Sequence, residues 1–118
     1  MWCDPAYVLD MLIAARKVLL FTNGMDRERF YSDEVMQNAV MHLLQIIGGA
    51  ARKVSPEYRE QHDEVSWHRI VGLRNRLVHE YGKISPEQVW DVVVVDLPAL
   101  VALVEPLVPP DSPENGSA

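Results

Sequence analysis

The sequence has few of the residues that form disulfides or bind metals. Cys3 is the only cysteine among 118 residues, so the chain cannot form an internal disulfide. Neither a cysteine cluster with metal-ligand spacing nor a glycine-rich phosphate loop is present. A single cysteine is typical of a protein from the reducing cytoplasm. We therefore expect a cytoplasmic protein with no metal site and no cofactor.

Long apolar runs are also missing. The most apolar N-terminal segment, Val8 to Phe21, is interrupted by Asp10, Arg16 and Lys17. No basic region followed by an apolar run and a small-residue cleavage site precedes it. The sequence therefore predicts neither a signal peptide nor a membrane span.

Positive charge is absent from the last third of the chain. Residues 84–118 contain no Lys or Arg and six acids, so residues 1–83 hold 11 basic and 11 acidic residues. The net charge of −6 thus belongs to the C-terminal segment. A local basic site on the first part of the chain is compatible with this balance, and nucleic-acid binding needs such a site.

The remaining composition is that of a globular protein, with 48% hydrophobic and 24% charged residues. This length suits one domain with a real core. The proline-rich, polar end "PPDSPENGSA" is typical of disorder. We expect one helical domain over residues 1–108 and a disordered tail over residues 109–118.

Apolar residues recur at helical spacing in several segments that carry helix-start signals. Asp4 with Pro5 is an expected N-cap and first-turn pair, and Ser32 is the expected N-cap of the second helix. The predicted pieces are a first helix to about Thr22, a short turn over Arg27 to Tyr31, a second helix to about Val54, a short piece from Ser55, a helix from Trp67 to about Tyr81, and a last helix from Ser85.

The last helix begins with "SPEQ", which predicts a capping box between Ser85 and Gln88. Pro98 should kink it, because proline removes a backbone donor and clashes with the preceding turn. The run Val92 to Val95 could be a strand, but no second strand exists to pair with it. The sequence therefore predicts an all-α fold, an antiparallel bundle of four longer helices with short connecting helices.

The segment "RNRLVHEYG" places polar residues where an apolar stripe is expected. On an ideal helix Arg74 lies at the centre of that stripe, within about 60° of its apolar neighbours and of Tyr81. A buried arginine needs an acid, a second subunit or an anionic ligand. A structural role for such an arginine, paired with an acid at the edge of the core, is the ordinary alternative.

Asn75 and His79 lie on one flank of this helix, at a spacing that lets the amide orient the imidazole. Arg76 points further round, towards solvent or a partner. Arg74 and His79 diverge by about 140°, so they need not meet at one small substrate within a single chain. A two-fold axis would bring two copies of each into one cleft. We therefore predict a homodimer formed through this helix.

The motif "RNRLVHEY" resembles the Arg-x4-His-x-Tyr signature of HepT-like toxins in the HEPN superfamily. The blocks "AVMHLLQIIGGAARKVS" and "VWDVVVVDLPAL" are similar to other helices of that family. The resemblance implies an all-α homodimer that cleaves RNA without a metal and is paired with an MNT nucleotidyltransferase antitoxin. It also implies that Arg74 and His79 are catalytic and that the antitoxin attaches AMP to Tyr81. Asn75 and Arg76 are then supporting or RNA-binding residues.

One position departs from the family pattern. The family's second helix usually reads Ile-Gly-Glu-Ala, whereas this chain has Gly49 in place of the glutamate. The change either removes an acid that partners the arginine or leaves more positive potential for RNA. A function of a different class is a non-catalytic helical dimer that binds a nucleotidyltransferase or a nucleotide, and Gly49 is the feature that favours it.

Overall fold

The computed structural model describes residues 3–109, and the predicted tail lies outside them except for Pro109. The described residues form helices and no strand, which confirms the all-α prediction. None of these helices is long and apolar enough to cross a membrane. The elements are α1 (Asp4–Phe21), α2 (Arg27–Tyr31), α3 (Glu34–Lys53), α4 (Pro56–Gln61), α5 (Trp67–His79), η1 (Tyr81–Lys83), α6 (Pro86–Asp91), η2 (Val92–Asp96), α7 (Leu97–Val104) and η3 (Glu105–Leu107).

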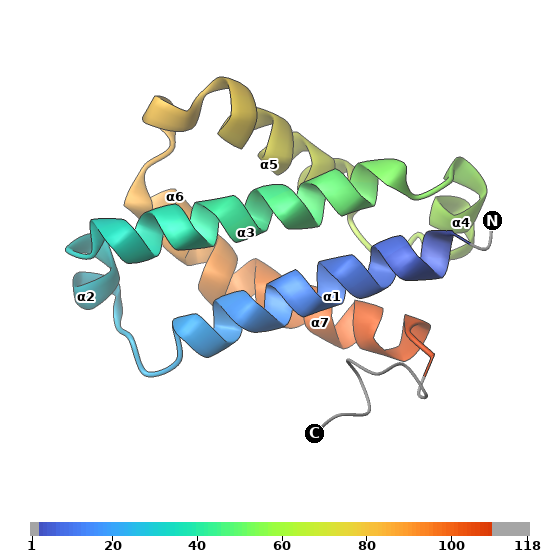
Figure 1. Cartoon of the computed structure of the whole chain (residues 1–118), viewed down its shortest axis with the longest axis horizontal. Coiled ribbons are helices and arrows are strands. Elements are labelled where there is room, and N and C mark those ends of the chain that lie inside the picture. The colour runs from blue at the N-terminus through green and yellow to red at the C-terminus, as the bar shows by residue number, and fades with distance from the viewer. Residues whose placement is uncertain (1–2, 110–118) are drawn as a thin grey trace.

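Helix α3 is the centre of the arrangement. It runs antiparallel to α1 on one side and to α5 on the other, while α7 packs against α1 (Figure 1). The core lies between α1, α3, α6 and α7, because each of these helices turns an apolar stripe inward. Its fully buried members include Val8, Met11, Phe30, Val40 and Val104. Helix α5 has only two buried residues, Trp67 and Leu77, so it lies at the edge of the bundle.

Two predicted N-caps are wrong, and both differences have a clear cause. Asp33 caps α3 in place of Ser32, since its carboxylate accepts a hydrogen bond of 2.9 Å from the backbone N–H of Met36. Asp4 is the first residue of α1 and is buried. Its carboxylate accepts hydrogen bonds from the backbone N–H of Ser55 at 2.9 Å and from its hydroxyl at 2.7 Å. Asp4 therefore joins the start of α1 to Ser55, the N-cap of α4.

The pKa of Asp4 reflects two opposing influences. Burial raises the pKa of this carboxyl, whereas the hydrogen bonds from Ser55 lower it by stabilising the charged form. The balance leaves the pKa below the ordinary value of 3.8. Asp4 is thus charged in the folded protein at neutral pH.

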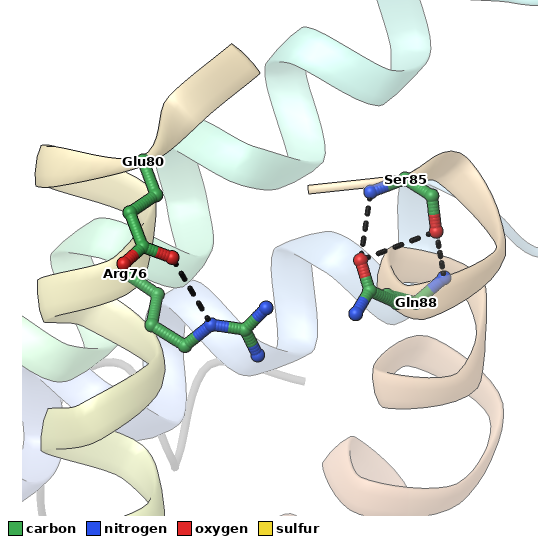
Figure 2. A network of polar contacts seen from close by, with 4 residues as sticks. All are labelled: Arg76, Glu80, Ser85 and Gln88. Atoms are coloured by element: carbon green, nitrogen blue, oxygen red, sulfur yellow. Dashed lines mark hydrogen bonds and ion pairs between the residues drawn. The ribbon is translucent and has the colours of Figure 1, made fainter. Parts of the chain in front are cut away.

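The last helix starts as predicted, and its regular α-helical form is interrupted near Pro98, where a kink was predicted. The Ser85 hydroxyl accepts from the backbone N–H of Gln88, and the Gln88 side chain accepts from the backbone N–H of Ser85 (Figure 2). Val92–Asp96 then forms a π-helical turn just before Pro98, whose ring fits the start of α7. The valine run is therefore helical, and the strand alternative is wrong.

Candidate active site

The candidate site begins where α5 crosses α3 at Gly48. A β-carbon added to Gly48 would lie 2.1 Å from Cβ of Arg74 and 3.1 Å from the backbone oxygen of Ile70. No side chain other than hydrogen fits there, so Gly48 lets the two helix backbones approach closely. The close neighbour of Gly48 is Arg74. Gly49, in contrast, faces open space.

Arg74 is half-buried in the stripe that packs on α3 of the same chain. The neighbouring helix α3, and not a partner subunit, therefore covers the middle of this stripe. The guanidinium donates a hydrogen bond of 3.1 Å to the side-chain oxygen of Asn75. Asn75 was expected to orient His79, but the structure pairs it with the arginine. This bond leaves most of the guanidinium donors available for an anionic ligand.

His79 is the last residue of α5 and is exposed. The helix ends there because Glu80 leaves the helical conformation, with φ −130° and ψ 36°. His79 lies five residues beyond Arg74, which is about 7.5 Å along the helix axis. Arg74 lines a groove between α1 and α3 to which His79 does not contribute.

Arg76 lies on a different side of α5 from Arg74. Its side chain extends toward α6 and the Ser85–Gln88 capping box, and its Nε lies 3.8 Å from a carboxylate oxygen of Glu80 (Figure 2). It lines a cavity between α5 and α6, whereas Arg74 does not. The structure therefore does not bring Arg76 together with the other candidate residues.

Tyr81 was predicted to continue α5, and this part of the prediction is wrong. Tyr81 begins the short helix η1 and is 44% exposed. Its hydroxyl donates a hydrogen bond to the side-chain oxygen of Asn38 in α3. Asn38 carries no local sequence signal, because nothing near it indicates that a residue 43 positions later lies beside it. Asn38 therefore positions the phenol beside α3.

A groove of about 620 Å³ lies between α1 and α3, next to Arg74. We call it the basic groove. Its charged residues are four cations and one acid, and its floor is aliphatic. Gly49 lines it without a side chain, so the space beside the guanidinium is open. The charged lining residues are Asp10, Lys17, Arg52, Lys53 and Arg74.

Together these features supply side chains that phosphodiester chemistry can use. A cationic groove can hold a polyanion, the Arg74 fork can bind phosphate oxygens, and an imidazole such as that of His79 can donate and accept protons. Among residues 3–109, no three His, Cys, Asp or Glu side chains are grouped so that they could hold a metal ion. The fold and the site thus define a helical protein equipped to act on nucleic acid.

Comparison with known proteins identifies the family. The model of the family described as "Ribonuclease HepT-like" matches residues 11–107. The chain is 36% identical over 100 residues to "Putative RNase MJ1380" of Methanocaldococcus jannaschii, covering 85% of this chain and 92% of that protein. It is 30% identical over 101 residues to "Probable ribonuclease HepT" of Thermococcus cleftensis, covering 86% and 92%. No solved structure matches the chain.

The chain therefore belongs to the HepT-like ribonuclease family. The match includes α5 and η1, which carry the candidate residues. The resemblance read from "RNRLVHEY" is confirmed. Family membership supports ribonuclease activity for this chain, and RNA is the corresponding substrate.

Proposed function

We propose that the chain is a metal-independent endoribonuclease that acts as the toxin of a toxin–antitoxin pair. Its site forms between two copies of the chain, and a nucleotidyltransferase antitoxin neutralises it by attaching AMP to Tyr81. The observation that carries this proposal is the placement of Arg74 on the basic groove, with His79 exposed further along the same helix. The predicted domain of residues 1–108 is the catalytic unit in this proposal.

The proposed reaction uses the nucleophile that RNA itself carries. The 2′-hydroxyl loses its proton and its oxygen attacks the adjacent phosphorus, while the bond from phosphorus to the 5′-oxygen breaks. The leaving oxygen takes up a proton, so the products are a 2′,3′-cyclic phosphate and a 5′-hydroxyl. His79 transfers protons in this scheme. Arg74 stabilises the charge on the phosphate oxygens with two parallel donors, a geometry that lysine lacks.

A homodimer fits the separation of the two groups along and around α5. Because a two-fold interface apposes the same patch from both subunits, it can place His79 of one chain near Arg74 of the other. Val78, which precedes His79 directly, is 42% exposed and offers apolar surface for such a contact. The site is therefore a composite of two chains in this proposal.

Mixed dimers test the composite site directly. Neither Arg74→Ala nor His79→Ala homodimer should cleave RNA, whereas dimers reassembled from an equal mixture should recover about a quarter of wild-type activity, because half of them are heterodimers with one intact site. Product analysis should find the cyclic phosphate. A mixture as inactive as its components would contradict the shared site. A His79→Ala dimer that cleaves RNA like wild type would exclude the histidine from the chemistry.

Neutralisation by AMP depends on the exposure of Tyr81 in η1, just beyond the end of α5. A nucleotide on this phenol adds bulk and negative charge beside the RNA-binding surface, so it opposes substrate by sterics and repulsion. Co-expression with a neighbouring nucleotidyltransferase, followed by intact-mass measurement, tests this step. The AMP increment should appear on wild type and be absent from Tyr81→Phe. An increment that survives this substitution would exclude Tyr81 as the acceptor.

One observation favours a second function, a non-catalytic dimer that binds a nucleotidyltransferase or a nucleotide. Gly49 provides no carboxylate beside Arg74, so an acid that could organise a catalytic cleft is missing at this position. Expression in cells distinguishes the two functions. Growth arrest that a neighbouring nucleotidyltransferase relieves, and that His79→Ala abolishes, supports the ribonuclease toxin. Harmless expression of wild type supports the binding dimer.

A further inference from the structure

The basic groove concentrates positive charge on a chain whose net charge is −6. Lys17 on α1 and the adjacent pair Arg52 and Lys53 at the end of α3 are all exposed, and Asp10 is the one carboxylate among the charged lining residues. None of these three cations belongs to the "RNRLVHEY" motif. The groove therefore has a charge of its own, opposite in sign to that of the whole protein.

The shape of the groove suits a strand with alternating charged and less polar parts. Its aliphatic lining includes Ile13 of α1, the helix that carries Lys17, and Ile46 of α3, the helix that carries the Arg52–Lys53 pair. The Nζ of Lys53 lies 5.7 Å from the ring centre of Tyr7, so its stem is held along the rim. From Tyr7 to Lys17 the wall of α1 is about 15 Å long. A length of single-stranded backbone fits this wall, with phosphates on the rim and a sugar or base over the floor.

Arg74 connects the groove to the proposed chemistry. It lines the groove from α5, across the close contact at Gly48, while Lys17 lies on α1 at the far wall. A strand held in the groove would therefore present one phosphate to Arg74 and the neighbouring phosphates to the lysines. An arginine alone binds one phosphate, whereas a row of cations also sets the position of the chain along the site.

We propose that the basic groove binds the single-stranded RNA backbone beside the cleaved phosphate, with Lys17 and Lys53 as phosphate-binding, positioning residues. This inference rests on the proposed function for the identity of the polyanion as substrate. An acidic surface of a partner protein could meet the same cations. RNA is the better occupant because the groove is continuous with Arg74, which must itself meet a phosphate during cleavage.

The test measures binding apart from cleavage. A fluorescein-labelled 2′-O-methyl oligoribonucleotide lacks the nucleophilic hydroxyl, so wild-type protein binds it without cutting, and anisotropy reports affinity against salt. Lys17→Gln/Lys53→Gln should reduce the slope of log affinity against log salt by about 1.4, since each single-strand phosphate contact contributes about 0.7. At about 0.1 M salt this corresponds to roughly 25-fold weaker binding.

The matched control removes the same charge elsewhere. Arg27→Gln/Arg29→Gln alters two exposed arginines of α2, a helix that contributes no residue to the groove. We expect its salt slope to stay near that of wild type. Far-UV circular dichroism and thermal melts verify that both variants fold. Equal slopes for the two double variants would overturn the proposal.

A second pair of variants tests the charge of the groove without removing a lysine. A side chain at Gly49 enters open space, so both Gly49→Glu and Gly49→Gln can be accommodated. The two replacements have nearly the same shape, and only the glutamate adds negative charge. The glutamate variant should bind the oligonucleotide about fivefold more weakly than the glutamine variant. Equal binding by the two would contradict a phosphate beside Arg74.

The outcomes separate the groove from the ribonuclease proposal. If the lysine variant shows the expected loss of salt dependence relative to wild type, but wild type cleaves no RNA, the groove is supported and the catalytic proposal fails. If wild type cleaves RNA and the lysine variant binds and cleaves as well as its control, the groove is refuted while catalysis stands. If the lysine variant keeps its RNA affinity but no longer binds the nucleotidyltransferase, the occupant is a protein and the proposal is overturned.

Discussion

The contact between Gly48 and Arg74 gives a sharp test of how the site is positioned. In Gly48→Ala the new methyl carbon would lie 2.1 Å from Cβ and 2.8 Å from Cγ of Arg74. Carbon atoms in contact normally lie about 3.5–4.0 Å apart. Cβ is fixed to the backbone of α5, so rotation of the side chain cannot relieve the clash. The two helices must therefore separate or slide by at least about 1 Å at this crossing.

The expected cost follows from two opposing effects. Overpacking of this kind costs about 1–3 kcal/mol, while replacing a helical glycine by alanine contributes about 1 kcal/mol of stability. The free energy of unfolding should thus fall by about 0–2 kcal/mol, and Tm by up to roughly 8 °C. Catalysis should suffer more, because a misplacement of about 1 Å can reduce the rate about 100-fold. We expect kcat/KM for RNA cleavage to fall by about that factor.

Gly72→Ala is the matched control. Gly72 also lies in a helix, α5, but a β-carbon there meets nothing within 4 Å and the residue does not line the basic groove. This variant should be more stable than wild type by up to about 1 kcal/mol and should keep its activity. Both variants are assayed below their melting temperatures. A Gly48→Ala protein as stable and as active as Gly72→Ala would refute the close approach of α3 and α5.

Two further predictions concern contacts outside the groove. Asn38→Ala removes the hydrogen-bond partner of the Tyr81 hydroxyl, so the rate of AMP transfer to Tyr81, measured by intact mass, should rise about 2- to 10-fold, the equivalent of one hydrogen bond. Asn23→Ala is the control. An equal rise in the control, or no rise in Asn38→Ala, would contradict the role of Asn38. The folded-state pKa of Asp4 lies below its unfolded value, so its contribution to stability is present above about pH 4 and is lost as pH falls through the folded pKa. In urea unfolding, the free energy of unfolding should therefore fall more steeply with decreasing pH for wild type than for Asp4→Asn. Identical pH dependence in the two proteins would show that the Asp4–Ser55 contact does not contribute to acid sensitivity.

Most of the helical framework could be predicted from the sequence. Caps and breaks depend on residues within about four positions of each other, so the Ser85–Gln88 capping box and the break before Pro98 follow from local chemistry. The wrong N-cap at Asp4 has the complementary reason. Asp4 has cap chemistry, but its carboxylate bonds to Ser55, 51 positions away, and no local pattern reports such a contact.

The candidate site divides in the same way. The motif singles out Arg74 and His79 as candidates, and helical spacing places the arginine in the stripe that packs on another helix. That helix is α3 of the same chain and not part of a second subunit. The course of α5 beyond His79 was not, because Tyr81 is held by Asn38 from α3 instead of by the helix. Hydrogen-bonding groups that are far apart in sequence meet only after the helices have packed.

The sequence by itself determined the helices, the family motif and the placement of negative charge in the last third of the chain. Only the tertiary structure decided that Gly48, and not Gly49, is the glycine the packing requires. It also decided that Lys17 and Lys53, 36 positions apart in the sequence, line one groove with Arg74. The reason is physical: helix formation depends on near neighbours, whereas a groove and its charge depend on which helix faces pack side by side.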